Sequence, residues 1–224
     1  MNKKETVEKL VYIPQGEVTL EGSLEIPAGA AGVVLFAHGS GSSRHSPRNN
    51  YVADVLRQHG LGTLLLDLLT SAEDRDYEMR FNIDLLAQRL LAATKWIKGQ
   101  DETRQLTVGY FGASTGAAAA IQTAAILGDQ IKAIVSRGGR PDLAGPFLGG
   151  IKSPILLIAG GNDDMVIELN QQAYKKINIA KQLEIVPGAT HLFEEPGALE
   201  NVAELAARWF RKYLTATRVA DRAD

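Results

Sequence analysis

The stretch LTVGYFGASTGAAAA, residues 106–120, contains the pattern that decides the fold. In it, a short apolar run ends in Gly112-Ala113-Ser114-Thr115-Gly116, and a run of small residues follows. An apolar run of this length is typical of a buried strand, and small residues let a helix pack close to a sheet. The pattern predicts a strand, a sharp turn at Ser114 and a helix, which together form a unit of an α/β protein.

The same alternation continues along the chain. Further apolar runs rich in Val, Ile and Leu occur at residues 33–37, 63–66, 131–135, 155–159 and 182–186. Helical patterns lie at residues 47–59, 83–97, 114–127 and 202–214, the first opened by an N-cap at Ser46 and Pro47. Strands and helices in this order predict a mostly parallel central sheet with helices on both faces.

The two ends of the chain and the interval 136–153 complete the predicted architecture. Short β-like segments at residues 10–13, 18–20 and 23–26, with turn residues at Gln15-Gly16 and Glu21-Gly22, predict N-terminal antiparallel strands. Residues 136–153 are rich in Gly and Pro and leave no room for a lid domain. We expect one domain over residues 1–214, followed by a polar tail at 215–224 that frays.

Composition excludes several functional classes. The chain of 224 residues has no cysteine, which excludes disulfides, thiolate metal sites and a cysteine nucleophile. A net charge of −2 gives no reason to expect nucleic acid as a partner. No apolar run reaches the roughly 18 residues that span a bilayer, and no signal peptide is recognisable, so a cytoplasmic protein without membrane contact is expected. No cofactor or metal is predicted, since there is no H-E-x-x-H and His38 has no second ligand at metal spacing.

The G-x-S-x-G pattern points to Ser114 as a nucleophile. A serine between a strand end and a helix start takes strained backbone angles, which project its hydroxyl from the sheet edge. Small flanking residues are needed there because neighbouring backbone comes close. The N–H of Thr115, at the start of the helix, is then the expected first donor to an oxyanion.

A nucleophilic serine needs a base and a residue that orients the base. Of four histidines, His191 follows the last predicted strand, in a loop bracketed by turn residues, whereas His59 suits a helix cap. Asp163 and Asp164 follow the strand at 155–159, and the spacing G-x-x-D-x-x-V favours Asp163. The order Ser, Asp, His along the chain is that of a hydrolase with a nucleophile elbow.

The loop His38-Gly39-Ser40-Gly41 follows the first central strand. Its backbone is expected to supply the second oxyanion donor, from the N–H of Ser40 or alternatively of Gly41. The loop lacks the Gly-x4-Gly-Lys of a phosphate-binding loop and the third glycine of a dinucleotide fingerprint.

With these motifs together, the chain resembles the α/β-hydrolase superfamily, specifically its dienelactone-hydrolase-like branch. The resemblance runs over residues 33–214 and rests on the 38–42 loop, the 112–116 elbow, Gly161-Asn162-Asp163 and residues 190–193. It implies the α/β-hydrolase fold and a Ser114–Asp163–His191 triad. Dienelactone hydrolases proper use cysteine as the nucleophile, and a serine there is more similar to a carboxylesterase or small-ester hydrolase.

The sequence therefore predicts a serine hydrolase that cleaves a small, soluble carboxylic ester or lactone through an acyl-enzyme. A thioesterase, amidase or acyltransferase with the same triad, a non-catalytic binding protein and a dinucleotide-dependent oxidoreductase remain alternatives. Arg44 and Arg137, with His38, Gly39 and Gly41, are candidate substrate contacts, and the arginines could hold a substrate carboxylate or could instead be structural. The oligomeric state is left open.

Overall fold

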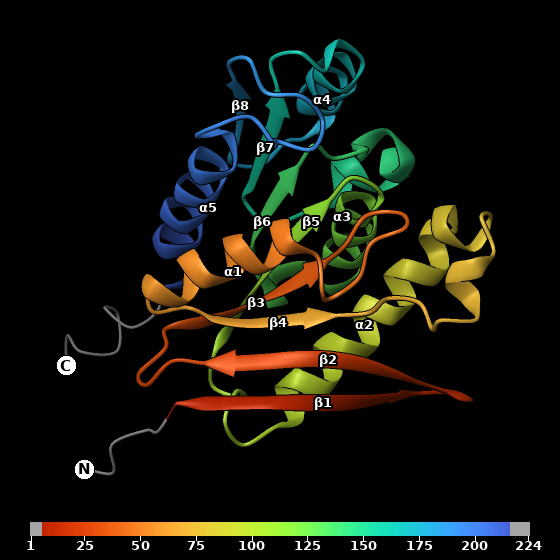
Figure 1. Ribbon diagram of the computed structural model, residues 1–224, viewed down its shortest axis with the longest axis vertical. Helices are drawn as coiled ribbons and strands as arrows, with labels where there is room; N and C mark the ends of the chain where they lie inside the picture. Colours follow the sequence, from red (N-terminus) through yellow and green to blue (C-terminus); the bar gives the residue numbers. More distant parts are fainter. Residues whose placement is uncertain (1–5, 216–224) are drawn as a thin grey trace.

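The structure, a computed structural model, describes residues 6–215 and contains one eight-stranded sheet in the order β1-β2-β4-β3-β5-β6-β7-β8 (Figure 1). β2 runs antiparallel to β1 and β4, and the remaining neighbours are parallel. The strands are β1 (Val7–Gln15), β2 (Val18–Ile26), β3 (Gly32–Ala37), β4 (Gly62–Leu66), β5 (Thr107–Ala113), β6 (Ile131–Arg137), β7 (Ile155–Gly160) and β8 (Lys181–Val186). The predicted α/β fold with N-terminal antiparallel strands is confirmed.

The predicted turn at Glu21-Gly22 is wrong, because one strand, β2, spans residues 18–26. Gly22 pairs with Val11 on one side and Leu66 on the other. A side chain at Gly22 would meet the Leu64 side chain at 3.0 Å, so the glycine lets neighbouring side chains cross the strand. The turn at Gln15-Gly16 is confirmed: β1 ends at Gln15, and Gly16 has a φ of 61°.

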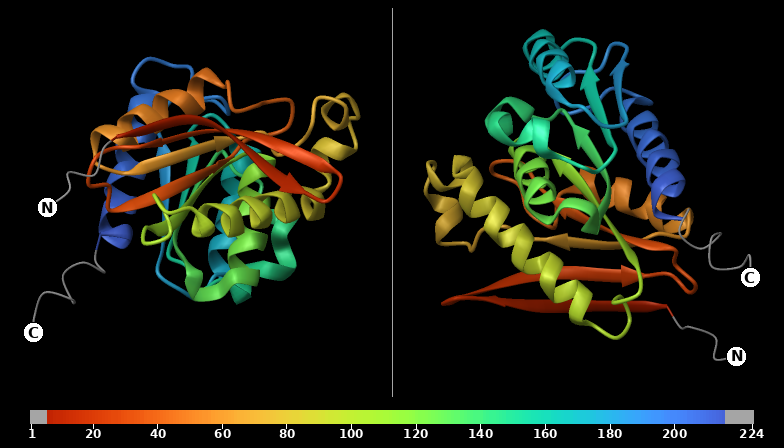
Figure 2. Two further views of the ribbon diagram at one scale, coloured as in Figure 1. Left: turned by 90° about the horizontal axis from the view of Figure 1, so that it is seen from below. Right: turned by 180° about the vertical axis from the view of Figure 1, so that it is seen from behind.

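Helices cover both faces of the sheet, as predicted (Figures 1 and 2). α1 and α5 pack on one face, with buried side chains such as Leu56 and Phe210. α2, α3 and α4 contribute Leu90, Ala118 and Ala173 to the core on the other face. The helices are α1 (Pro47–Gln58), α2 (Ile83–Gly99), α3 (Thr115–Leu127), α4 (Asp164–Lys176) and α5 (Ala198–Leu214).

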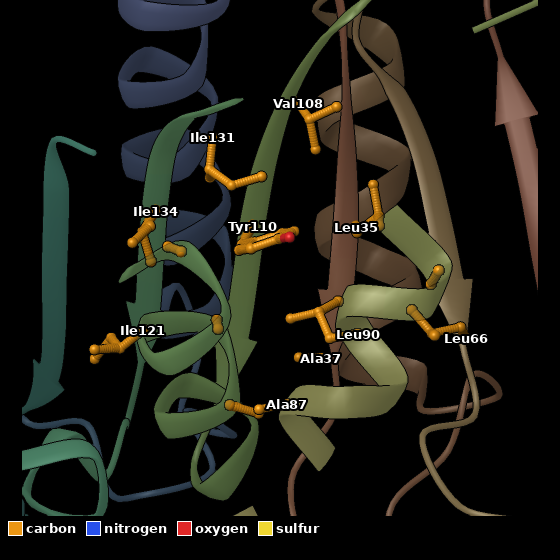
Figure 3. Close-up of a cluster of buried hydrophobic side chains, with 14 of the residues drawn as sticks. Leu35, Ala37, Leu66, Ala87, Leu90, Val108, Tyr110, Ile121, Ile131 and Ile134 are labelled. Atoms are coloured by element: carbon orange, nitrogen blue, oxygen red, sulfur yellow. The ribbon is translucent and has the colours of Figure 1, made fainter. Parts of the chain in front are cut away.

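The core on the α2–α3 face is built around β5 (Figure 3). Tyr110 is fully buried there among Leu35, Leu90 and Ile134. Its hydroxyl lies 2.6 Å from the Thr94 Oγ1, which satisfies the one polar atom of this ring. The buried alanines of α3 confirm that small residues bring this helix close to the sheet.

Three segments were not predicted from the sequence. α4 was missed because its buried positions are Val166, Asn170 and Ala173, and a buried asparagine interrupts the apolar period. The interval 136–153, expected to be loop-like, contains the 3-10 segment η4 (Pro141–Gly150). Between β4 and α2 the chain forms the short 3-10 turns η1 (Glu73–Arg75) and η2 (Met79–Phe81). Of the expected frayed tail, residues 216–224 lie outside the described residues.

Candidate active site

Ser114 occupies a strained turn between β5 and α3. Its φ of 50° and ψ of −120° lie in a region that non-glycine residues rarely adopt, and only Phe193 shares a positive φ among the non-glycine residues that the structure describes. Its N–H donates to the Arg137 carbonyl at 3.2 Å, and its carbonyl accepts from the N–H groups of Ala117 and Arg140, both at 3.1 Å. Backbone hydrogen bonds therefore hold the strained conformation in place.

Glycines around the elbow are required by close backbone approach. A Cβ at Gly112 would lie 2.8 Å from the Ala117 nitrogen, and one at Gly116 would lie 2.5 Å from the His38 carbonyl oxygen. Gly39 faces Ser114 directly, since a Cβ there would lie 3.0 Å from the Ser114 Cβ. The loop after β3 and the elbow after β5 are thus packed against each other, with no room for side chains at these positions.

Asp163 and His191 form a close pair beyond the ends of β7 and β8. The His191 Nδ1 lies 2.7 Å from the Asp163 Oδ2, and the carboxylate is largely buried while the imidazole is 40% exposed. Asn162 links the two loops, because its N–H donates to the Ala189 carbonyl and its Nδ2 to the Gly188 carbonyl, both at 2.9 Å. Asp164 is exposed as the first residue of α4. The structure therefore brings Asp163, rather than its neighbour, to the imidazole.

Two backbone N–H groups beside the elbow are free to bind an anion. Neither the Ser40 N–H nor the Thr115 N–H donates a hydrogen bond to another group within residues 6–215. Both residues line one narrow crevice, together with Gly39 and Gly41. Thr115 opens α3, so the positive end of the helix dipole lies at the same place.

His38 is held inside the protein by both ring nitrogens. Its Nδ1 donates to the Gly39 carbonyl at 2.9 Å, and its Nε2 accepts from the Leu68 N–H at 3.0 Å. A carbonyl only accepts and an amide only donates, so the imidazole is the neutral tautomer protonated at Nδ1. Burial lowers the pKa of His38, in agreement with this assignment. The ring ties the loop after β3 to the segment after β4 and leaves no nitrogen for a substrate.

The two candidate arginines have contrasting surroundings. The Arg44 guanidinium pairs with Asp67 and with Glu21, so its charge is already balanced. Arg137, at the end of β6, is 7% exposed and forms no ion pair within the described part of the chain; its guanidinium lies 5.9 Å from the centre of the Phe193 ring. Its Nε is buried without a hydrogen-bond acceptor. Burial, and secondarily the charge of Arg48, lowers the pKa of Arg137 to about 10, so it remains a cation at neutral pH.

The segment between β4 and α2 contributes wall residues that the sequence did not indicate. Leu69 and Asp74 of this segment line the crevice with Ser40 and Thr115, next to Leu86 of α2. An open hollow of about 330 Å³, also bordered by Leu69 and Asp74, adjoins the crevice. No sequence signal places these residues, because the excursion over residues 67–82 has no regular period. No group of three or more metal-ligating His, Cys, Asp or Glu side chains occurs among residues 6–215.

Comparisons with known proteins agree with this architecture. The model of the dienelactone hydrolase family matches residues 33–216. A crystal structure described as a dienelactone hydrolase from Anabaena variabilis is 55% identical, with 94% of this chain and 99% of that chain covered and a TM-score of 0.91. Est1E from Butyrivibrio proteoclasticus is 18% identical, with 91% and 98% covered and a TM-score of 0.79, which shows a shared fold.

A curated relative from Mycobacterium tuberculosis, provisionally named a phosphoribosyl transferase, is 55% identical over 204 residues. The match covers 91% of this chain but 46% of the relative, so the chain spans about half the length of the curated relatives it matches. The family match, in contrast, covers most of the chain and includes the elbow and both loops of the Asp–His pair. The chain belongs to the dienelactone hydrolase family and has the α/β-hydrolase fold.

Proposed function

We propose that the protein is a serine hydrolase that cleaves a small carboxylic ester or lactone through a covalent acyl-enzyme on Ser114. The observation that carries this proposal is the 2.7 Å contact between His191 Nδ1 and Asp163 Oδ2. A carboxylate accepts from Nδ1, so the neutral imidazole has its proton there and its Nε2 is free to act as a base. A histidine held in this tautomer can activate a serine hydroxyl within its reach, and Ser114 on its strained elbow is the serine that we propose.

In the first half of the reaction, the Ser114 Oγ attacks the ester carbonyl carbon while the His191 Nε2 accepts the hydroxyl proton. Asp163 keeps the imidazole oriented and stabilises the imidazolium that forms. The unpartnered N–H groups of Ser40 and Thr115 are the proposed donors to the tetrahedral oxyanion. Collapse of the intermediate breaks the bond to the alcohol oxygen, which receives the proton from His191 and departs.

In the second half, a water molecule takes the place of the departed alcohol. His191 removes a proton from this water as the hydroxide attacks the acyl carbonyl, and the same two N–H groups bind the second oxyanion. The bond to the Ser114 Oγ then breaks, the oxygen regains its proton from His191, and a carboxylic acid is released. The proton count closes with one ester and one water converted to one acid and one alcohol.

The substrate is proposed to be small, because the β6–β7 connection holds only η4 and no lid domain that would shelter a lipid. Within residues 6–215 no helix is long and apolar enough to cross a bilayer. We propose a cytoplasmic location, because a chain without cysteine forms no disulfides and needs no oxidising compartment. We assign the protein no nucleic-acid partner. The Mycobacterium tuberculosis relatives that are named as phosphoribosyl transferases are about twice as long as this chain, and we do not propose a transferase activity for it.

Arg137 is the proposed contact for an anionic group on the substrate, because its buried charge has no carboxylate partner within the described residues. Arg44, already paired with Asp67 and Glu21, is left as the weaker candidate. Arg137→Met is expected to raise KM about tenfold for a carboxylated ester and to leave KM for its neutral analogue unchanged, the loss corresponding to one charge-assisted hydrogen bond. Equal KM changes for the two esters would remove this contact from the proposal.

The reaction is tested by rapid mixing with a p-nitrophenyl ester of a short-chain acid. An acyl-enzyme that forms faster than it is hydrolysed gives a burst of one nitrophenolate per active site, and mass spectrometry of the quenched enzyme finds the acyl group on Ser114. Ser114→Ala eliminates both signals. Turnover that persists in Ser114→Ala would contradict the proposed mechanism.

A further inference from the structure

Ser114, Asp163 and His191 come from three separate strand ends, and one short turn contacts the surroundings of all three. This turn, residues 137–140, joins the end of β6 to η4. We infer that the 137–140 turn is a positioning element that sets the distance between the nucleophile and the Asp–His pair. The inference rests on the proposed function, because it assigns the backbone of this turn a positioning role in that reaction.

On the nucleophile side, the turn bonds to both peptide groups of Ser114. The Ser114 N–H donates to the Arg137 carbonyl at 3.2 Å, and the Arg140 N–H donates to the Ser114 carbonyl at 3.1 Å. The elbow and the turn therefore move together, since a shift of either one breaks two backbone hydrogen bonds that have no solvent replacement in a buried site.

On the acid side, the turn is fixed to the element that begins next to Asp163. The Gly138 N–H donates to the Ile158 carbonyl of β7 at 2.8 Å. Asn170, fully buried in α4, donates from its Nδ2 to the Gly139 carbonyl at 3.0 Å. Asp163 is the N-cap residue of this same helix, so Asn170 links the turn to the segment that carries the triad carboxylate.

On the base side, the turn lies directly against the histidine loop. Gly138 has a φ of 51°, and a Cβ built on it would lie 3.2 Å from the His191 carbonyl oxygen and 3.4 Å from its Cε1. The same Cβ would lie 3.4 Å from the Phe193 ring. Phe193 is buried and has a φ of 58°, so the loop beside the turn is itself held in a strained conformation.

These contacts have a catalytic consequence because proton transfer requires the base to lie within hydrogen-bond reach of the hydroxyl. A misplacement of about 1 Å by a residue outside the chemistry can lower the rate about a hundredfold. Gly138 is the point at which the turn, β7 and the histidine loop meet. A side chain there would push the His191 loop away from Ser114, whereas the glycine permits contact.

The experiment compares Gly138→Ala with Gly128→Ala in the full chain. Gly128, the C-cap of α3, also has a positive φ, 55°, so an alanine is strained there too, but the nearest neighbour of its Cβ would be the Lys152 side chain at 3.8 Å. Because the neighbours of a Cβ at Gly138 would have to move by a few tenths of an ångström, Gly138→Ala is expected to lower kcat about tenfold with KM unchanged, and to slow labelling of Ser114 by a fluorophosphonate in proportion. Gly128→Ala is expected to keep kcat within about twofold of the wild type, although both variants lose thermal stability.

Asn170→Ala supplies a second test that does not add a side chain at the turn. It removes the hydrogen bond to the Gly139 carbonyl, and kcat is expected to fall about tenfold with KM unchanged. This variant decides the question if Gly138→Ala does not fold. A kcat for folded Gly138→Ala equal to that of Gly128→Ala, or an Asn170→Ala variant with wild-type kcat, would overturn the inference. A wild-type enzyme without ester turnover or Ser114 labelling would instead overturn the proposed function.

Discussion

Ser114 and the Asp163–His191 pair are held in place by different means. Ser114 is fixed by backbone hydrogen bonds and by glycines that admit no side chain, all within a few residues of the elbow or directly against it. Asp163 and His191 are fixed by side-chain and loop contacts between segments 28 residues apart. The first region is a close-packed backbone arrangement that tolerates little change, and the second depends on how the side chains of two loops meet. A substitution in the first region should change the position of the Ser114 hydroxyl, whereas one in the second should change how that hydroxyl is activated.

Loss of the nucleophile is expected to have the largest effect. Ser114→Ala should lower kcat about 10⁶-fold, because the residual binding groups cannot replace the covalent step. Steady-state hydrolysis of a short-chain ester measures it. Alanine relieves little of the positive-φ strain, so thermal stability should stay near that of the wild type. A rate within tenfold of the wild type would mean that Ser114 is not the nucleophile.

The acid–base side is tested by two neighbouring aspartates. Asp163→Asn should lower kcat about 10⁴-fold, since an amide in place of the carboxylate favours the wrong imidazole tautomer. Asp164→Asn is the matched control, because this exposed residue is not in contact with His191. Its kcat should stay within about twofold. Equal losses in both variants would count against Asp163 as the orienting residue.

The packing of the loop after β3 against the elbow can be probed at Gly39. Gly39→Ala places a methyl group 3.0 Å from the Ser114 Cβ and should lower kcat about a hundredfold by displacing the loop. Gly149→Ala is the control, because neither glycine has a positive φ and the nearest neighbour of a Cβ at Gly149 would lie at 3.9 Å. Kinetics of both variants on one ester separate the local clash from the general effect of replacing a glycine.

The smallest expected effect concerns His38. Its neutral imidazole ties the loop after β3 to the segment after β4. Because burial lowers the pKa of His38, the unfolded chain binds a proton more readily than the folded protein does below the ordinary histidine pKa of about 6.5. Stability should therefore be highest above this pH and should decrease as the pH falls. His38→Gln should show a weaker decrease between pH 7 and 5 in thermal denaturation. An identical pH dependence in the two proteins would mean that burial does not hold His38 in its neutral form.

The two regions also differ in how far the sequence predicts them. The elbow was predictable because its residues are contiguous, and the conformation of Ser114 follows from its position between an apolar run and a small-residue run. The spacing alone favoured Asp163 over Asp164, and the observed contact agrees with that preference. The turn predicted at Glu21-Gly22 was wrong because glycine occurs both in turns and in strands where neighbouring side chains fill the space above it.

What the sequence could not predict depends on contacts between segments far apart in the chain. Asn170 breaks the apolar pattern of α4 because its side chain donates to the Gly139 carbonyl, which is 31 residues away in the chain. The candidate arginines looked equivalent, but only the fold pairs Arg44 with Asp67 and leaves Arg137 buried without a carboxylate partner among residues 6–215. Hydrogen bonds and ion pairs of this kind follow from packing, so no local pattern contains them.

The most direct test of the central claim, an activated serine at position 114, is reaction with a fluorophosphonate followed by peptide mass spectrometry. The wild-type enzyme should form one adduct, located on Ser114, and His191→Ala should form it at least a hundredfold more slowly because the hydroxyl has lost its base. An adduct elsewhere, or no adduct in a protein shown to be folded, would contradict the account.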